Sequence, residues 1–235
     1  LGGSINIMNS YSYEVEIKCL LDDGEKTARM LREQMHNLDP DYKHLGTESQ
    51  LNHYFIKGNL PYFFEQVRKY LRESDAVQLR SLISRARDYS LRTRKTDTEL
   101  LLVLKASVDD TTSANGTARI EFEATLPSFT LEELDTLLLN SGFQYQSKWS
   151  RVREKYCFLG MNVSIDKNAG YGYIAEFEVV EDDKKKVEST KARIRETIGR
   201  LGLKELPQER LERMFAYYNA HWPQYYGTEK TFSIY

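Results

Sequence analysis

The chain has 235 residues, of which 40% are hydrophobic and 29% are charged. A chain of this length and composition can bury a core without disulfides or zinc, which excludes a disordered protein, and no apolar run reaches the roughly 18 residues that a membrane-spanning helix needs. The 33 basic and 35 acidic residues leave a net charge of −2, which argues against broad, sequence-independent binding to nucleic acid.

Alternating and helical hydrophobic patterns predict eight strands and five helices with no linker longer than a loop. The first four elements are a strand at Tyr13–Leu21, a helix at Glu25–Met35, a strand at Leu51–Lys57 and a helix from Pro61 to about Arg72. There follow strands at Asp88–Lys95, Leu100–Ala106 and Thr117–Leu126, the last after a loop at 109–116, and then a helix at Thr130–Leu139. The last five are strands at Trp149–Leu159, Met161–Asp166 and Tyr173–Val180 and helices near Lys184–Leu201 and Pro207–Ala220.

The order of these elements favours one α+β domain over a parallel α/β fold. Strands dominate the middle of the chain and helices stand at the junctions, which is typical of an antiparallel sheet or barrel. We expect this domain to span residues 11–222. Residues 1–10 are expected to be an expression-vector remnant with a disordered start, and residues 223–235 an aromatic C-terminal tail. Because the chain shows no secretory signal, a cytoplasmic location is expected.

Charged residues alternate with apolar residues along five of the predicted strands. Side chains two residues apart on a strand share one face, so each charged set lines one surface of the sheet. On a single strand the pattern is typical of a solvated outer face, but its recurrence on five strands indicates a shared charged surface. The five sets are Glu14, Glu16 and Lys18; Arg92 and Arg94; Arg119, Glu121 and Glu123; Arg151 and Arg153; and Glu176 and Glu178.

The composition of these sets predicts a site for metal and polyphosphate. Two carboxylates at positions i and i+2 lie ~7 Å apart and repel by roughly 2 kcal/mol at an effective dielectric constant of ~20, so the glutamate pairs gain nothing unless cations lie between them. Carboxylate oxygens select Mg²⁺, Mn²⁺ or Ca²⁺, and forked arginine side chains bind phosphate oxygens. With Asp166 and Lys105 included, the acids and bases balance, and two divalent cations would leave the positive charge that a triphosphate neutralises.

In this pattern the chain resembles the CYTH superfamily, the triphosphate tunnel metalloenzymes. The segment Glu14-Val15-Glu16-Ile17-Lys18 is similar to the ExExK signature of that family. The likeness continues in family order through Leu91–Arg94, Leu104-Lys105, Arg119–Glu123, Arg151–Tyr156, Asp166, Gly172 and Glu176–Glu178. The resemblance implies an α+β fold in which an eight-stranded antiparallel β-barrel forms a tunnel with helices packed around it, as a single CYTH-like tunnel domain.

The resemblance also implies roles for individual residues. It assigns catalysis to Glu14, Glu16 and Lys18. It assigns substrate binding to the basic residues Lys18, Arg92, Arg94, Lys105, Arg119, Arg151 and Arg153. It assigns metal binding to the acidic residues Glu14, Glu16, Glu121, Glu123, Asp166, Glu176 and Glu178, with Mg²⁺ or Mn²⁺ as the cofactor and two ions per site. Thr93, between two of the arginines, is expected to point outward.

The leading functional prediction is a divalent-metal-dependent hydrolase of inorganic triphosphate or a small organic triphosphate. One alternative is a class IV adenylyl cyclase, in which the ribose 3′-hydroxyl of ATP replaces water and pyrophosphate leaves. The other is a non-catalytic module that binds polyphosphate or nucleotide. The expected partner is a small-molecule triphosphate, with no nucleic acid or membrane, and the chain is expected to be a monomer or a homodimer. For the aromatic tail we weigh packing on the outside of the barrel against closure of one end of the tunnel.

Overall fold

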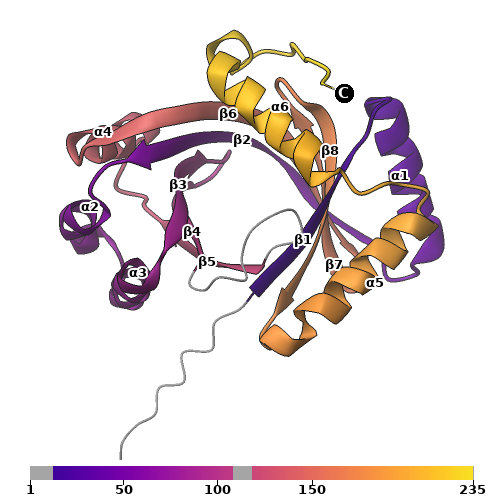
Figure 1. The fold of residues 1–235 in the computed structure, drawn as a ribbon, viewed down its shortest axis with the longest axis horizontal. Coiled ribbons are helices and arrows are strands. Elements are labelled where there is room, and N and C mark those ends of the chain that lie inside the picture. Colours follow the sequence, from indigo (N-terminus) through magenta and orange to yellow (C-terminus); the bar gives the residue numbers. More distant parts are fainter. Residues whose placement is uncertain (1–12, 108–117, 235) are drawn as a thin grey trace, which may run out of the picture.

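The computed structural model describes residues 13–107 and 118–234, which form a barrel of eight antiparallel strands with helices on its outside (Figure 1). This is the α+β tunnel fold that the sequence predicts. The expected disordered start at 1–10 and the loop at 109–116 lie outside the described residues. None of the helices in the described part is both long and apolar enough to span a membrane.

The strands follow one another around the barrel in the order β1-β5-β4-β3-β2-β6-β7-β8. Their bounds are β1 Tyr13–Leu20, β2 Lys43–Lys57, β3 Asp88–Lys95, β4 Leu100–Ser107, β5 Ala118–Thr125, β6 Phe143–Phe158, β7 Met161–Asn168 and β8 Gly172–Glu181. Strand β1 closes the barrel. It pairs with β8 over its full length and with β5 where Glu14 faces Arg119 and Val15 faces Ala118.

Strand β2 is longer than predicted, because it begins at Lys43 rather than at Leu51. The added segment, residues 43–50, is mostly polar and shows no clear alternation of its own. It is held in the sheet by pairing with β6, which is also longer than predicted and begins at Phe143. Pairing with β6 therefore makes this segment a strand, although its local sequence pattern favours a strand only weakly.

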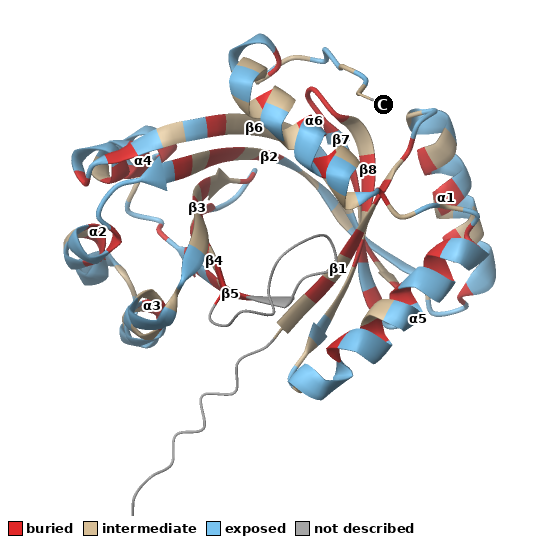
Figure 2. Ribbon diagram, viewed as in Figure 1, coloured by how far each residue is buried: buried red, intermediate tan, exposed pale blue. Residues whose placement is uncertain are grey.

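Six α-helices in the described part of the chain lie outside the barrel, one more than predicted. Their bounds are α1 Glu25–Leu38, α2 Leu60–Val67, α3 Glu73–Arg85, α4 Leu131–Asn140, α5 Val187–Arg200 and α6 Gln208–His221, with short 3-10 turns at Arg68–Tyr70, Lys184–Lys186 and Trp222–Gln224. The single helix expected from Pro61 to about Arg72 ends at Val67, and α3 follows it after Arg72. Figure 2 shows buried residues where the helices face the sheet and exposed residues on their outer sides.

The hydrophobic core lies between the outer face of the barrel and the helices, rather than inside the barrel. One cluster packs α2, α3 and α4 against β3, β4 and β5, and another packs α1 and α5 against β1, β7 and β8. On β1, for example, Val15 and Ile17 are fully buried in the second cluster, so the alternating residues Glu14, Glu16 and Lys18 turn to the interior of the barrel.

A buried polar network joins α4 to the outside of the sheet. The carboxylate of Asp135 on α4 accepts hydrogen bonds from Thr93 on β3 at 2.8 Å and from Tyr145 on β6 at 2.7 Å, and it bonds to Nδ1 of His53 on β2 at 2.6 Å. Nε2 of His53 in turn bonds to the hydroxyl of Tyr226 in the C-terminal tail at 2.8 Å. Thr93 therefore points outward, as expected, and the network ties the tail to the barrel.

Candidate active site in the barrel

The interior of the barrel holds a cavity of about 560 Å³. All the charged site residues predicted from the sequence line it, apart from Asp166, whose side chain is buried on the inner face beneath Arg151 and Arg153, and Arg119, whose side chain lies outside the described part of the structure. The charged lining consists of Glu14, Glu16, Lys18, Arg92, Arg94, Lys105, Glu121, Glu123, Arg151, Arg153, Glu176 and Glu178. The strand alternation therefore brings together residues that are more than 160 positions apart in the chain.

Two lysines lie between carboxylates from different strands. Lys105 Nζ is 2.6 Å from Glu14 Oε2 and 2.9 Å from Glu121 Oε2. Lys18 Nζ is 2.9 Å from Glu16 Oε1 and 3.1 Å from Glu176 Oε1. Each ammonium group thus bridges two acids, which places a positive charge where the carboxylates converge.

Arg92 and Arg94 lie on β3, the strand next to that of Lys105, and Arg92 and Lys105 both contact Glu121. Arg94 Nη1 donates to Glu123 Oε1 at 2.7 Å, and its Nε donates to Asn52 Oδ1 at 3.1 Å. Arg92 Nη1 donates to the hydroxyl of Tyr54 at 2.6 Å, and Nη2 donates to Glu121 at 3.3 Å. The Nε of Arg92 is buried and donates to no residue that the structure describes. A buried donor of this kind favours an acceptor supplied by a ligand.

Asp166 on β7 lies behind the arginines and not at the surface of the cavity. It is 1% exposed, and its carboxylate accepts from Arg153 Nε at 2.7 Å and from Arg151 Nη1 at 2.7 Å. Gln50 also supports Arg151, because its Oε1 accepts from Arg151 Nε at 2.8 Å. Asp166 orients two guanidinium groups toward the cavity, and its predicted metal-binding role stays a prediction.

On the acidic side of the cavity, burial and the neighbouring cations shift the pKa values of the carboxyl groups in opposite directions. Burial and a hydrogen bond to Glu121 raise the pKa of Glu14 to about 9, which indicates that these two carboxyl groups share a proton. Burial also raises the pKa of Glu178, with a further contribution from the negative charges of Glu16 and Glu176. By contrast, the charges of Lys18 and Lys105 keep the pKa of Glu16 below its usual value although burial opposes them.

On the basic side, two of the arginines have lowered pKa values. Burial and the neighbouring charge of Arg92 lower the pKa of Arg94 to about 10. Burial and Arg153 lower the pKa of Arg151 as well. Both guanidinium groups stay charged at neutral pH, but the charge is held in a poorly solvated site beside another arginine. An anion in the cavity would relieve that repulsion.

The donor set fits a hard divalent cation by its chemistry, since it consists of carboxylate oxygens. Among residues 13–107 and 118–234, no three acidic, histidine or cysteine side chains are gathered closely enough around one point to hold an ion in this arrangement. Lys18 and Lys105 lie between the carboxylates instead. A divalent ion bound there would displace ammonium contacts and stabilise the ionised form of Glu14 and Glu178, whose pKa values are raised first of all by burial.

Several uncharged lining residues were not predicted. Tyr54 on β2, Ser90 on β3 and Gln146, Ser147 and Trp149 on β6 line the cavity, as do Phe215 and Asn219 on α6. The strand residues could have been inferred by extending the alternation beyond the charged positions. Phe215 and Asn219 carry no such signal, because α6 reaches the barrel only through tertiary packing against β6.

A second cavity, of about 900 Å³, adjoins the first at Arg151. It lies among the ends of β1 and β7, the start of β8 and the middle of β2 and β6, and the C-terminal tail at 227–234 forms part of its wall. The tail is held there by backbone hydrogen bonds of 2.8 Å from Gly170 to Lys230 and from Phe232 to Gly170. The rings of Tyr225 and Phe232 pack in a cluster with Tyr218. The tail therefore packs on the barrel and also borders the second cavity.

A family model and several solved structures match the chain. The model of the CYTH domain matches residues 81–210. A protein from Pyrococcus horikoshii OT3 is similar in structure with a TM-score of 0.59 and 20% identity, over 86% of this chain and 99% of its own. A candidate adenylate cyclase from Vibrio parahaemolyticus is similar with a TM-score of 0.56 and 14% identity, over 87% of this chain and 98% of its own. No curated protein matches the sequence. At sequence identities of 20% and 14%, the structural similarity shows a shared fold.

Proposed function

Since the chain belongs to the CYTH domain family, we propose that it is a divalent-metal-dependent hydrolase that cleaves the terminal phosphoanhydride bond of inorganic triphosphate or a small organic triphosphate. The substrate would bind in the charged cavity of the barrel. The alternatives, a class IV adenylyl cyclase and a non-catalytic polyphosphate-binding module, would use the same cavity and differ in the products.

The observation that carries this proposal is the crowding of buried guanidinium groups on one side of the cavity. Arg94 and Arg151 have lowered pKa values, and the Nε of Arg92 has no partner among the described residues. Three arginines held in this way present a preorganised set of donors for phosphate oxygens. Asn52, Gln50 and Asp166 keep these side chains in place before any substrate arrives.

The acidic residues of the cavity would hold the metal cofactor, Mg²⁺ or Mn²⁺, with two ions per site. The proposed ligands are Glu14, Glu16, Glu121, Glu123, Glu176 and Glu178, with Asp166 as a further candidate. Bound divalent cations supply charge neutralisation for the phosphoryl group and lower the pKa of water. Burial raises the pKa values of Glu14 and Glu178, so a bound cation would stabilise the ionised form of these poorly solvated carboxyl groups.

Glu16 and Lys18 are the proposed catalytic pair, with Glu14 beside them. In the hydrolytic step a water oxygen forms a bond to the terminal phosphorus while the bridging P–O bond breaks. Glu16 stays ionised, since Lys18 and Lys105 lower its pKa against the effect of burial, so its carboxylate can accept the proton of the water. The charges of Glu16 and Glu176 raise the pKa of Lys18 although burial opposes them, so the ammonium group stays protonated and can donate to phosphate oxygens. Arg92, Arg94, Lys105, Arg119, Arg151 and Arg153 are the other proposed phosphate ligands.

Product analysis by phosphorus NMR tests this function. The protein is incubated with inorganic triphosphate or with ATP, in the presence of Mg²⁺, Mn²⁺ or a chelator. We expect orthophosphate and pyrophosphate from triphosphate, with no turnover in the chelator. Cyclic AMP and pyrophosphate as the products from ATP would establish the cyclase instead, and binding without turnover of either compound would establish the non-catalytic module.

A further inference from the structure

The cavity in the barrel has a neutral side as well as a charged one. Its uncharged lining includes the rings of Tyr54, Trp149 and Phe215 and the amide group of Asn219. Inorganic triphosphate is a uniformly charged ligand and needs none of these groups. Ligand sites that combine aromatic surfaces with a few placed polar groups are typical of organic molecules.

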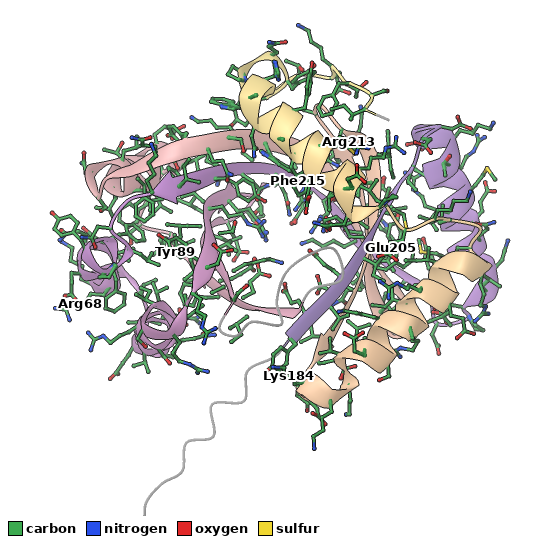
Figure 3. The ribbon with its side chains drawn as sticks, viewed as in Figure 1. Arg68, Tyr89, Lys184, Glu205, Arg213 and Phe215 are labelled. Carbon is green, nitrogen blue, oxygen red and sulfur yellow. The ribbon has the colours of Figure 1, made fainter. Side chains whose placement is uncertain are left out.

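A continuous series of contacts leads from the charged side to the neutral side. Arg92 donates to Tyr54 at 2.6 Å, the ring of Tyr54 lies 5.3 Å from that of Trp149, and the ring of Trp149 lies 5.4 Å from that of Phe215. Asn219 follows Phe215 after one turn of α6, so the two side chains lie on the same face of the helix. Figure 3 shows Phe215 on α6 beside the opening of the barrel.

Helix α6 is fixed in this position by its own packing. The hydroxyl of Tyr218, which is fully buried, donates to the backbone carbonyl of Lys148 at 2.8 Å. The rings of Tyr218 and Trp149 are in edge contact at 5.0 Å. The neutral side is therefore a preformed surface, and a ligand that fits it does not have to order the helix first.

The Oδ1 atom of Asn219 is buried and accepts no hydrogen bond from the described residues. Arg92, whose Nε is likewise buried and without a partner among the described residues, lines the same cavity. The two atoms need opposite hydrogen-bond partners, because Oδ1 is an acceptor and needs a donor, whereas Nε is a donor and needs an acceptor. Fully ionised inorganic triphosphate offers only acceptor oxygens. It can satisfy Arg92 but not Asn219.

We propose that Asn219 is a specificity-determining residue that accepts a hydrogen bond from an N–H donor on an aromatic ring attached to the triphosphate. This inference rests on the proposed function and narrows it to an organic triphosphate, the class that includes nucleotides with an exocyclic amino group. The phosphates lie on the arginines, the ring lies against the aromatic side chains, and the amino group reaches Asn219. A site built around a buried polar atom discriminates strongly against ligands that leave that atom unpaired.

Calorimetric titration in the presence of Mg²⁺ measures this preference. The probes are imidotriphosphate, adenosine 5′-(β,γ-imido)triphosphate and the corresponding purine riboside compound, which lacks the amino group. We expect the adenosine compound to bind at least about tenfold more tightly than either of the others. Asn219→Leu should remove the difference between the two nucleoside compounds and leave the affinity for imidotriphosphate within about twofold of the wild type.

Two further variants keep the test independent of folding. Asn219→Asp retains an acceptor at the same place and should keep the preference for the amino compound, although its charge weakens the binding of all three probes. Ala216→Leu changes an exposed position of the same helix and should alter nothing. Equal binding of the two nucleoside compounds to the wild type, or a preference that survives in Asn219→Leu, would overturn the inference and leave the proposed function standing. Absence of binding by all three probes would overturn both.

Discussion

Arg153 and Asp166 form a two-pronged ion pair in the wall of the barrel: Nε donates to Oδ1 at 2.7 Å and Nη2 donates to Oδ2 at 2.6 Å. Asp166 is 1% exposed, so its charge depends on protein donors rather than on water. The charges of Asp166 and Glu176 raise the pKa of Arg153 although burial opposes them. Arg153 therefore stabilises the folded barrel in addition to being a proposed phosphate ligand.

We expect Arg153→Ala to destabilise the protein by about 3–5 kcal/mol, because it leaves a buried carboxylate with only part of its compensation. Urea unfolding at neutral pH measures the change. The double variant Arg153→Ala with Asp166→Ala should recover part of the loss, since it removes the uncompensated charge. A single variant as stable as the wild type would show that Arg151 alone suffices to hold Asp166.

Arg94→Ala, unlike Arg153→Ala, should not destabilise the protein. Burial and the charge of Arg92 lower the pKa of Arg94, so its charged form is disfavoured in the folded protein. Removing it should leave the melting temperature unchanged or slightly raised, while the affinity for imidotriphosphate falls at least about tenfold. Thermal unfolding and calorimetric titration of the same preparation separate these effects. A lowered melting temperature with unaltered affinity would make Arg94 structural.

Asp135→Asn tests the buried network on the outside of the barrel. Three side chains bond to the carboxylate of Asp135, and the hydrogen bonds, that of His53 foremost, lower its pKa against the effect of burial. We expect the substitution to reduce the free energy of unfolding by about 1.5–3 kcal/mol at neutral pH.

The pH dependence of that difference follows from the direction of the shift. A carboxyl group whose pKa is lower in the folded state than in the unfolded state stabilises the protein above its ordinary pKa, about 3.9 for aspartate, and the stabilisation is lost as the pH falls through the folded-state value. The difference between the wild type and Asp135→Asn should therefore be constant above about pH 5 and shrink below about pH 4. A difference that grows on acidification would contradict the assignment.

Gly170→Ala tests how the C-terminal tail is held. Gly170 has φ +85°, and a Cβ atom there would lie 2.6 Å from ring carbons of Tyr218 and 3.1 Å from the ring of Phe232. We expect a lowered melting temperature and faster proteolysis within residues 227–234, because the added methyl group must displace Tyr218 of α6 and Phe232 of the tail that packs with it. Gly160→Ala is the matched control: its φ is +70° and a Cβ would meet nothing within 4 Å, so it adds backbone strain without the clash. Equal effects of the two variants would mean that strain alone, and not contact with the tail, is responsible.

Strand alternation was enough to predict the charged interior. Glu14, Glu16 and Lys18 alternate with Val15 and Ile17 in the sequence, and the structure divides these two sets between the cavity and the core. The pattern is reliable because an antiparallel strand has only two faces, and the outer face must bury its apolar residues against helices.

The alternation pattern gives the same prediction for residues that have different environments in the structure. Arg94 and Arg153 have equivalent places in their motifs, but only Arg153 pairs with a buried acid, because that depends on which strand becomes its neighbour. Asn219 lies on a helix whose position relative to the barrel is set by ring packing around Trp149. Local patterns cannot show such contacts, since they arise only when distant segments meet.

The most direct test of the central claim is a crystal structure of the protein with Mn²⁺ and imidotriphosphate, in which anomalous scattering locates the metal. We expect the phosphates on Arg92 and Arg94 inside the 560 Å³ cavity and the manganese beside Glu16 and Glu178. Phosphates bound only in the 900 Å³ cavity beside the tail, or manganese away from these carboxylates, would contradict the account.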